Sequence, residues 1–254
     1  MQVLSSYNTA RKNVDLTLGA ADFSFSSTST TARNPHLVAV RYASGLSLKF
    51  SGGVPAAAQP TRSRTVQIVL KRGMDVVLAV FALVILAPAL VLLGIAICLT
   101  SRGPALFCQD RDGLNGTVIS VYKFRSMYVD RSDAAVTPVG RFIRRTSIDE
   151  LPQLLNVIRG DMSLIGPRPH PVGLRAAGGS YEVLVPYYCA RHVMKPGISG
   201  WAQANGLRGS TEDAAAAEAR IEHDIAYIQN FNILLDIRIM IRTVLREFVT
   251  GTGY

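Results

Sequence analysis

The chain has 254 residues, of which 27 are basic and 18 acidic, so its net charge of +9 favours an anionic partner. A hydrophobic content of 48% excludes a chain that is disordered throughout, and a charged content of only 18%, against ~25% in typical soluble domains, indicates membrane contact. Three cysteines without a CxxC spacing and four scattered histidines exclude a disulfide scaffold and a zinc-finger-type site.

Residues 1–65 have the composition of a basic tail. They are rich in Ser and Thr, and they carry five of the nine net positive charges. Because they have no evident apolar period, we predict a disordered tail over 1–65. No apolar region follows the first basic residues, which argues against a secretory signal. Since most of the excess charge lies in this tail, a nucleic-acid-binding function is disfavoured.

A long apolar run follows. Val76 to Leu99 is 24 residues without a charged side chain, which is enough to cross a ~30 Å hydrocarbon layer. Pro88 divides it into arms of 12 and 11 residues, and each arm reaches only ~18 Å. The sequence therefore predicts a membrane segment over 66–102, either a re-entrant hairpin with both ends on one face or a kinked spanning helix.

Residues 103–254 have the pattern of a small, mixed α/β, mostly helical domain. A strand is predicted at Val118–Tyr122, and a helix covers Leu151–Ile158 and stops at Gly160. Further helices are predicted at about 211–230 and 233–249. The last one has an apolar stripe bordered by arginines, which favours an amphipathic helix lying in the membrane interface. These residues are Ile237, Ile241, Val244 and Phe248, with Arg238, Arg242 and Arg246.

Two adjacent carboxylates, Asp149 and Glu150, follow a group of arginines and precede the first of these helices. One interpretation is structural: Asp149 caps the helix, because Pro152 then falls at N3, where no backbone bond is lost. The other is chemical: the pair binds a divalent cation or attacks phosphorus, and arginines offset the charge of a phosphoryl group.

Two further stretches carry binding chemistry. In Gly166–Pro169, two prolines fix the backbone around Arg168 and present its guanidinium from a stiff loop. In Lys195–Gly206, three glycines surround Trp201 together with Gln203 and an asparagine, side chains that can stack on and hydrogen-bond a base or sugar. Either stretch by itself is equally consistent with a structural turn.

Together these stretches resemble the bacterial sugar transferases, the monotopic phosphoglycosyl transferases, over about Arg64–Tyr254. The matching motifs are Lys71–Asp75, Gly103–Pro104, Gln109–Arg111, Tyr122–Met127, Ser147–Asn156, Gly160–Pro169 and Lys195–Gly206. The resemblance implies a membrane-associated fold, with an N-terminal re-entrant helix broken at Pro88, a small cytosolic catalytic domain and interfacial amphipathic helices. Ala87 stands where the family often has serine.

The implied reaction transfers a hexose-1-phosphate from a UDP-sugar to undecaprenyl phosphate and releases UMP, as the first membrane step of exopolysaccharide synthesis. Asp149 and Glu150 are the implied catalytic pair and Mg²⁺ ligands, with Asp149 forming a phosphosugar-aspartyl intermediate. Glu150 either holds the metal or accepts a proton. Glucose is the best match and galactose the rival. The substrate-binding candidates are Arg168, Arg144, Arg145, Lys123, Arg125 and Gln203.

The expected location is the cytoplasmic face of the bacterial inner membrane, with a homodimer left open and no nucleic acid as partner. A competing hypothesis is a membrane-anchored interaction protein without catalysis. The presence of both acidic residues argues against it, and a basic face with interleaved aromatics, needed for a nucleic-acid binder, is absent from the sequence pattern.

Overall fold

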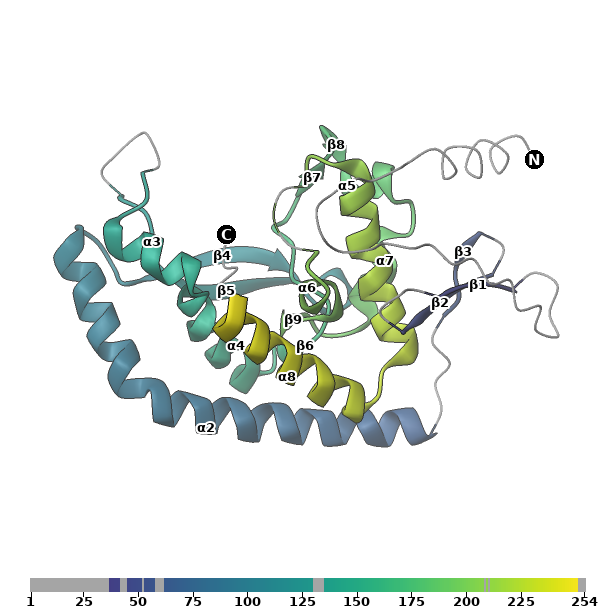
Figure 1. The fold of residues 1–254 in the computed structure, drawn as a ribbon, viewed down its shortest axis with the longest axis horizontal. Coiled ribbons are helices and arrows are strands. Elements are labelled where there is room, and N and C mark those ends of the chain that lie inside the picture. Colours follow the sequence, from purple (N-terminus) through teal and green to yellow (C-terminus); the bar gives the residue numbers. More distant parts are fainter. Residues whose placement is uncertain are drawn as a thin grey trace.

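The computed structural model describes residues 37–41, 45–51, 53–57, 62–129, 135–207, 209 and 211–250. It is mixed α/β and mostly helical, with short two- and three-stranded sheets and a body of helices and loops that lies along one long helix (Figure 1). Residues 1–36 of the predicted tail lie outside the described residues.

A small sheet occupies part of the predicted tail. Strands β1 (Leu37–Arg41), β2 (Ser47–Ser51) and β3 (Val54–Pro55) pair antiparallel. Leu48 is fully buried against helix α7 (Ala214–Asn230), while the Gln229 side chain bonds both the N–H and the carbonyl of Lys49 at 2.8 and 3.0 Å. The prediction of disorder is therefore wrong for the described residues 37–41, 45–51 and 53–57, because tertiary packing on α7 orders this sheet.

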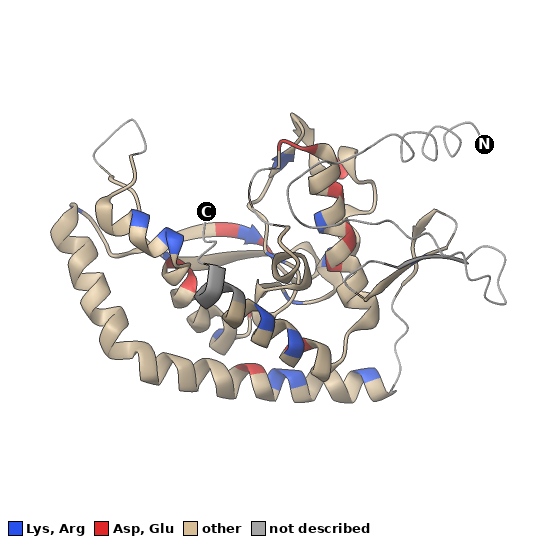
Figure 2. Cartoon of the chain, viewed as in Figure 1, with Lys and Arg blue, Asp and Glu red and all other residues tan. Residues whose placement is uncertain are grey.

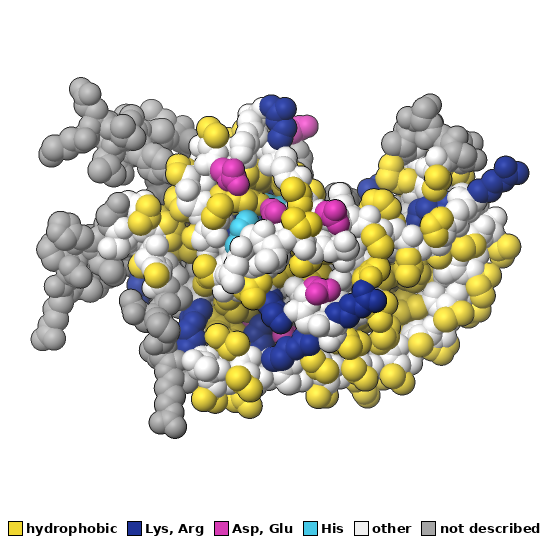
Figure 3. Space-filling model, turned by 180° about the vertical axis from the view of Figure 1, so that it is seen from behind, with side chains coloured by type: hydrophobic (Ala, Val, Ile, Leu, Met, Phe, Trp, Pro, Cys, Tyr) yellow, Lys and Arg dark blue, Asp and Glu magenta, His cyan; other side chains and the backbone are white. Residues whose placement is uncertain are grey.

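Helix α2 (Arg62–Thr100, 39 residues) contains the apolar run and begins four residues before the predicted boundary at 66. Within the described part of the chain, it is the one helix long and apolar enough to cross or insert into a membrane. The ribbon is continuous but bends, and Pro88 inside it supplies the cause (Figure 1). Its exposed apolar side chains follow the edge of the molecule in Figure 3.

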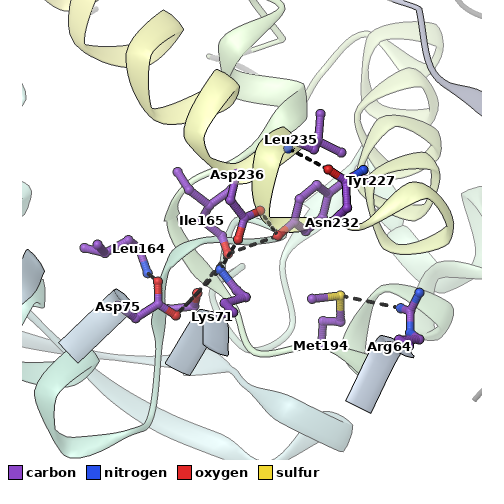
Figure 4. A network of polar contacts seen from close by, with 11 residues as sticks. Arg64, Lys71, Asp75, Leu164, Ile165, Met194, Tyr227, Asn232, Leu235 and Asp236 are labelled. Carbon is purple, nitrogen blue, oxygen red and sulfur yellow. Dashed lines mark hydrogen bonds and ion pairs between the residues drawn. The ribbon is translucent and has the colours of Figure 1, made fainter. Parts of the chain in front are cut away.

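A buried polar network joins the first part of α2 to the body (Figure 4). Lys71 Nζ lies 2.6 Å from Asp236 Oδ2, and Tyr227 Oη donates to Asp236 Oδ1 at 2.7 Å. One turn along α2, Asp75 accepts from Ser163 Oγ at 2.6 Å. Removing one partner of such a buried pair costs about 3–5 kcal/mol, so α2 is held firmly against the body.

The centre of the body matches the predicted elements. Strands β4 (Leu106–Asp112) and β5 (Val118–Phe124) form an antiparallel pair around the single turn η1 (Leu114–Gly116), and β5 contains the predicted strand. Helix α4 (Leu154–Arg159) ends at Gly160 in the left-handed region, as predicted. The other elements are α3 (Pro138–Arg145), η2 (Ile148–Gln153), β6 (Ser163–Ile165), β7 (Arg175–Ala176), β8 (Gly179–Ser180), α5 (Tyr181–Leu184), η3 (Tyr188–Val193), β9 (Gly197–Ser199) and α6 (Trp201–Ala204).

The two C-terminal helices also form where the sequence predicts them. Helix α7 begins after Asp213, whose side chain accepts from the Ala215 N–H, and α8 spans Ile233–Thr250. On α8, Leu235 and Ile239 are buried against α7, whereas the predicted apolar stripe is exposed. The stripe side chains that the structure describes are Ile237, Ile241 and Val244. Their placement in a membrane interface stays a prediction.

Candidate active site

The two carboxylates lie in η2, which begins after an unusual residue. Ser147 has φ +55°, a left-handed conformation that serine rarely adopts and that costs about 1–3 kcal/mol. Its side chain makes no capping bond, and Asp149 lies inside the 3₁₀ turn instead of at its start. The interpretation of Asp149 as a helix cap is therefore wrong. The strained turn leaves both carboxylates at the junction of α3, β5 and η2.

Glu150 is held by two cations. Lys123 Nζ lies 2.7 Å from Oε1, and the Arg168 guanidinium donates to Oε1 at 2.6 Å and to Oε2 at 3.3 Å. Burial opposes ionisation of Glu150, but Arg168 and Lys123 outweigh it and hold the pKa of Glu150 well below its usual range. This side chain is therefore a permanent anion that fixes the positions of Lys123 and Arg168.

The pKa of Asp149 is shifted in the opposite direction. Burial, and then the negative charge of Glu150, raise the pKa of Asp149 to about 6, although Lys123, Arg144 and Arg168 act in the other direction. Among the described residues, none forms a hydrogen bond or ion pair with its side chain. Adjacent carboxylates with pKa values moved in opposite directions are typical of catalytic sites, where one group anchors and the other reacts.

Three segments of the chain hold the loop that carries Arg168. Each of its four successive carbonyls accepts a hydrogen bond, from β9, from η3 and twice from β4, so the loop has little freedom left. Gly197 N–H donates to Pro167 at 2.9 Å, the Arg191 guanidinium to Arg168, the Arg111 guanidinium to Pro169 at 2.8 Å, and Asp112 N–H to His170 at 2.9 Å.

Arg191 and Asp224 are functional candidates that the sequence analysis missed. Both side chains are almost completely buried, and Arg191 Nη2 lies 2.7 Å from Asp224 Oδ2 while it also bonds the carbonyl of Arg168. The pair thus supports the residue that binds Glu150. Nothing in its sequence context gave a signal, because the two residues are 33 positions apart on η3 and α7.

The remaining predicted site residues separate into two groups. Arg144 and Arg145 lie in the last turn of α3, close enough that Arg144 affects the pKa of Asp149. Arg125 lies elsewhere: its guanidinium donates to the carbonyls of residues 101–104 beyond the end of α2, which is a structural role. Gln203 is buried in α6, and its Oε1 has no hydrogen-bond partner in the described part of the chain. Substrate binding by either residue stays a prediction.

Comparison with known proteins places this site in a family. The family model described as "Bacterial sugar transferase" matches residues 66–250. The "Exopolysaccharide production protein PSS" of Rhizobium leguminosarum bv. phaseoli is 48% identical over 74% of this chain and 99% of its own length. The "UDP-glucose:undecaprenyl-phosphate glucose-1-phosphate transferase" of Caulobacter vibrioides is 43% identical over 82% of this chain and 78% of its own length.

The protein with that same transferase name from Escherichia coli is also 43% identical over 82% of this chain, which covers only 46% of that relative's length. These matches and the paired carboxylates define a phosphotransferase with a membrane-compatible helix. The chain belongs to the bacterial sugar transferase family.

Proposed function

We propose that the chain transfers a hexose-1-phosphate, with glucose the first choice, from a UDP-sugar to undecaprenyl phosphate and releases UMP. The reaction would take place at the cytoplasmic face of the bacterial inner membrane and start an exopolysaccharide or related glycan. The observation that carries the proposal is the pair in η2, in which Glu150 is clamped and ionised while Asp149 is unpaired with its pKa raised to about 6. The names of the relatives supply the substrate classes.

Two displacements at one phosphorus atom account for the transfer. A carboxylate oxygen of Asp149 attacks the sugar-linked phosphorus of the UDP-sugar, and the bond to the bridging oxygen breaks so that UMP leaves with the electron pair. An oxygen of undecaprenyl phosphate then attacks the same phosphorus, and the Asp149 carboxylate is regenerated. Lys123 and Arg168, positioned by Glu150, stabilise the negative charge on the phosphoryl oxygens.

Magnesium fits the donor set. Asp149 and Glu150 offer oxygen ligands only, and Mg²⁺ commonly takes one or two carboxylates and completes its shell with phosphate oxygens and water. Among the described residues, no group of three or more acidic, His or Cys side chains is arranged to hold a metal ion, so substrate phosphate would be needed to complete the shell. When bound, the ion would neutralise phosphate charge. Because both Glu150 oxygens already accept bonds from cations, Asp149 has the freer lone pairs.

The exposed apolar surface of α2 supports a proposal for its arrangement in the membrane. We propose that α2 enters the bilayer as a bent helix and returns to the same face, since basic residues flank both ends and the bend occurs inside one continuous helix. The exposed apolar residues in its second half are Val84, Ile85, Val91, Leu92, Ile95 and Leu99. A shallow insertion would bring the active site to the height of the lipid phosphate.

The proposal is tested by UMP release from the purified protein in nanodiscs with magnesium and undecaprenyl phosphate. UDP-glucose and UDP-galactose are compared, with UDP-N-acetylgalactosamine added because a relative from Aeromonas hydrophila, 42% identical over 72% of this chain and 44% of its own length, is named for that sugar. Release that requires magnesium, is fastest with UDP-glucose and is lost in Asp149→Asn is the expected result. Release that persists in Asp149→Asn would contradict the assigned nucleophile.

A further inference from the structure

Helix α3 has one buried face and one charged face. Ile143 is fully buried against Ile97 of α2 and Phe124 of β5, and Gly140 lies so close to Ser126 that an added Cβ would come within 1.9 Å of its carbonyl oxygen. The orientation of α3 is therefore fixed. It places Arg141 and Arg145 at the surface.

These arginines are a source of uncompensated positive charge beside the carboxylate pair. Within the described residues, none of the three arginines of α3 forms an ion pair, whereas Lys123 and Arg168 are both paired with Glu150. Helix α3 contacts η2, and Arg144 acts on the pKa of Asp149. Near Asp149 the chain thus places two cations paired with Glu150, Lys123 of β5 and Arg168 of its loop, and a helix whose arginines form no ion pair among the described residues.

Helix α3 also lies against the apolar helix α2. Helix α3 packs on the C-terminal half of α2, and its basic residues are visible above that part of α2 in Figure 2. Exposed apolar side chains occur on both helices: Val91, Leu92, Ile95 and Leu99 on this half of α2, and Phe142 on α3, which is 58% exposed between the two outer arginines. A phosphate on a lipid chain could therefore meet α3 while its chain contacts apolar side chains.

We infer that Arg141 and Arg145 bind the phosphate of the lipid-linked acceptor, and that the two reaction partners use different cations. The donor diphosphate is held by Lys123 and Arg168, and the acceptor phosphate by α3. This assignment rests on the proposed function and deepens it. Arginine binds phosphate oxygens in a bidentate geometry, and the missing carboxylate partners leave both guanidinium groups available for it.

The test separates the two half-reactions in nanodiscs of neutral phosphatidylcholine. For Arg141→Gln/Arg145→Gln we expect the KM for undecaprenyl phosphate to rise about tenfold. The KM for the UDP-sugar, and the single-turnover release of UMP without acceptor, should stay at wild-type values. Arg175→Gln, at an exposed arginine of the β7–β8 hairpin, is the matched control. Restoration by Arg141→Lys/Arg145→Lys would show that charge carries the effect.

Three results would overturn the inference. The first is an equal loss in both half-reactions. The second is an unchanged acceptor KM. The third is an effect that appears only when anionic phospholipid is added, because α3 would then attract the bilayer surface and not the acceptor. If the double variant loses thermal stability, the single variants are measured in the same way. A wild-type protein that releases no UMP with any donor would instead refute the proposed function, and the acceptor assignment with it.

Discussion

The loop of Arg168 and helix α3 approach the same carboxylate pair but are built in opposite ways. The loop is internal, each carbonyl from Pro167 to His170 is bonded, and its arginine is paired with Glu150. Helix α3 is fixed on one side only, and it presents unpaired arginines beside an exposed phenylalanine. Under the proposed assignment of the two substrates, the soluble substrate would meet a preorganised surface and the lipid-borne substrate an open one.

The largest effect on activity is expected from replacing Asp149, which belongs to the carboxylate pair that both regions approach. Asp149→Asn should reduce UMP release by at least about 10³-fold, because an amide is not a competent nucleophile. The same variant should increase the free energy of unfolding at pH 7 by about 1–2 kcal/mol. The raised pKa means that the ionised carboxylate destabilises the fold above pH 6, and partial exposure reduces the effect.

Thermal unfolding and UMP release measured on the same preparation check this prediction. A variant that is inactive and less stable than the wild type would mean that Asp149 is a structural carboxylate. Glu150→Gln is the matched comparison: it should lose stability, since Lys123 and Arg168 lose their anion.

The second prediction concerns the Arg191–Asp224 ion pair, which supports the loop of Arg168. Arg191→Met leaves Asp224 buried without a partner and should cost about 3–5 kcal/mol of stability. In Arg191→Met/Asp224→Leu both charges are removed, so stability should largely recover. The carbonyl of Arg168 still lacks its donor, and kcat/KM for the UDP-sugar should stay about 10- to 100-fold low. Full recovery of kcat/KM in the double variant would show that the pair serves stability alone.

The third prediction uses the pH dependence of the first half-reaction. In the proposed mechanism Asp149 attacks as the carboxylate, so kcat/KM for UMP release should fall as the pH drops, with a midpoint near 6. In Glu150→Gln the negative neighbour is gone and Lys123 and Arg168 keep their charge, so this midpoint should move to lower pH. A midpoint near 4 in the wild type would contradict the environment assigned to Asp149.

The smallest effect on catalytic activity is expected from a substitution in the N-terminal sheet, outside both regions. Leu48→Ala should lower the free energy of unfolding by about 2–5 kcal/mol, because the side chain is fully buried against α7, while kcat and KM at low temperature stay near wild-type values. Val54→Ala is the control, at a position 57% exposed. A loss of kcat that exceeds the loss of folded protein would mean that the N-terminal sheet also influences the site.

Local patterns predicted the elements well. The apolar run, the Asp112–Gly116 turn region, Gly160 and the two C-terminal helices each have a signal within a few residues, and each forms as expected. The N-terminal sheet was missed although Leu46, Leu48 and Phe50 alternate, because such a short strand pattern becomes stable only when α7 covers it.

The site was predictable only where residues are close in sequence. Asp149, Glu150 and Arg168 stand in compact motifs, and the structure brings them together. Arg125 stands in a motif as well, yet its guanidinium donates hydrogen bonds to backbone carbonyls beyond the end of α2. Arg191 and Asp224 have no local signal, since an ion pair between distant residues depends on how the chain folds. A sequence motif shows which residue type is required at a position. It does not show whether that side chain contacts substrate or supports the backbone.

The polar network around Lys71 has a mechanical consequence. Because Lys71 and Asp75 tie α2 to α8 and β6, the helix and the body tilt together. In the re-entrant arrangement proposed above, a rotation of α2 in the bilayer would be transmitted to η2 through these contacts. The depth at which Asp149 meets a lipid phosphate would then follow the depth of α2. Bilayer composition should therefore regulate turnover without any change in the concentration of either substrate.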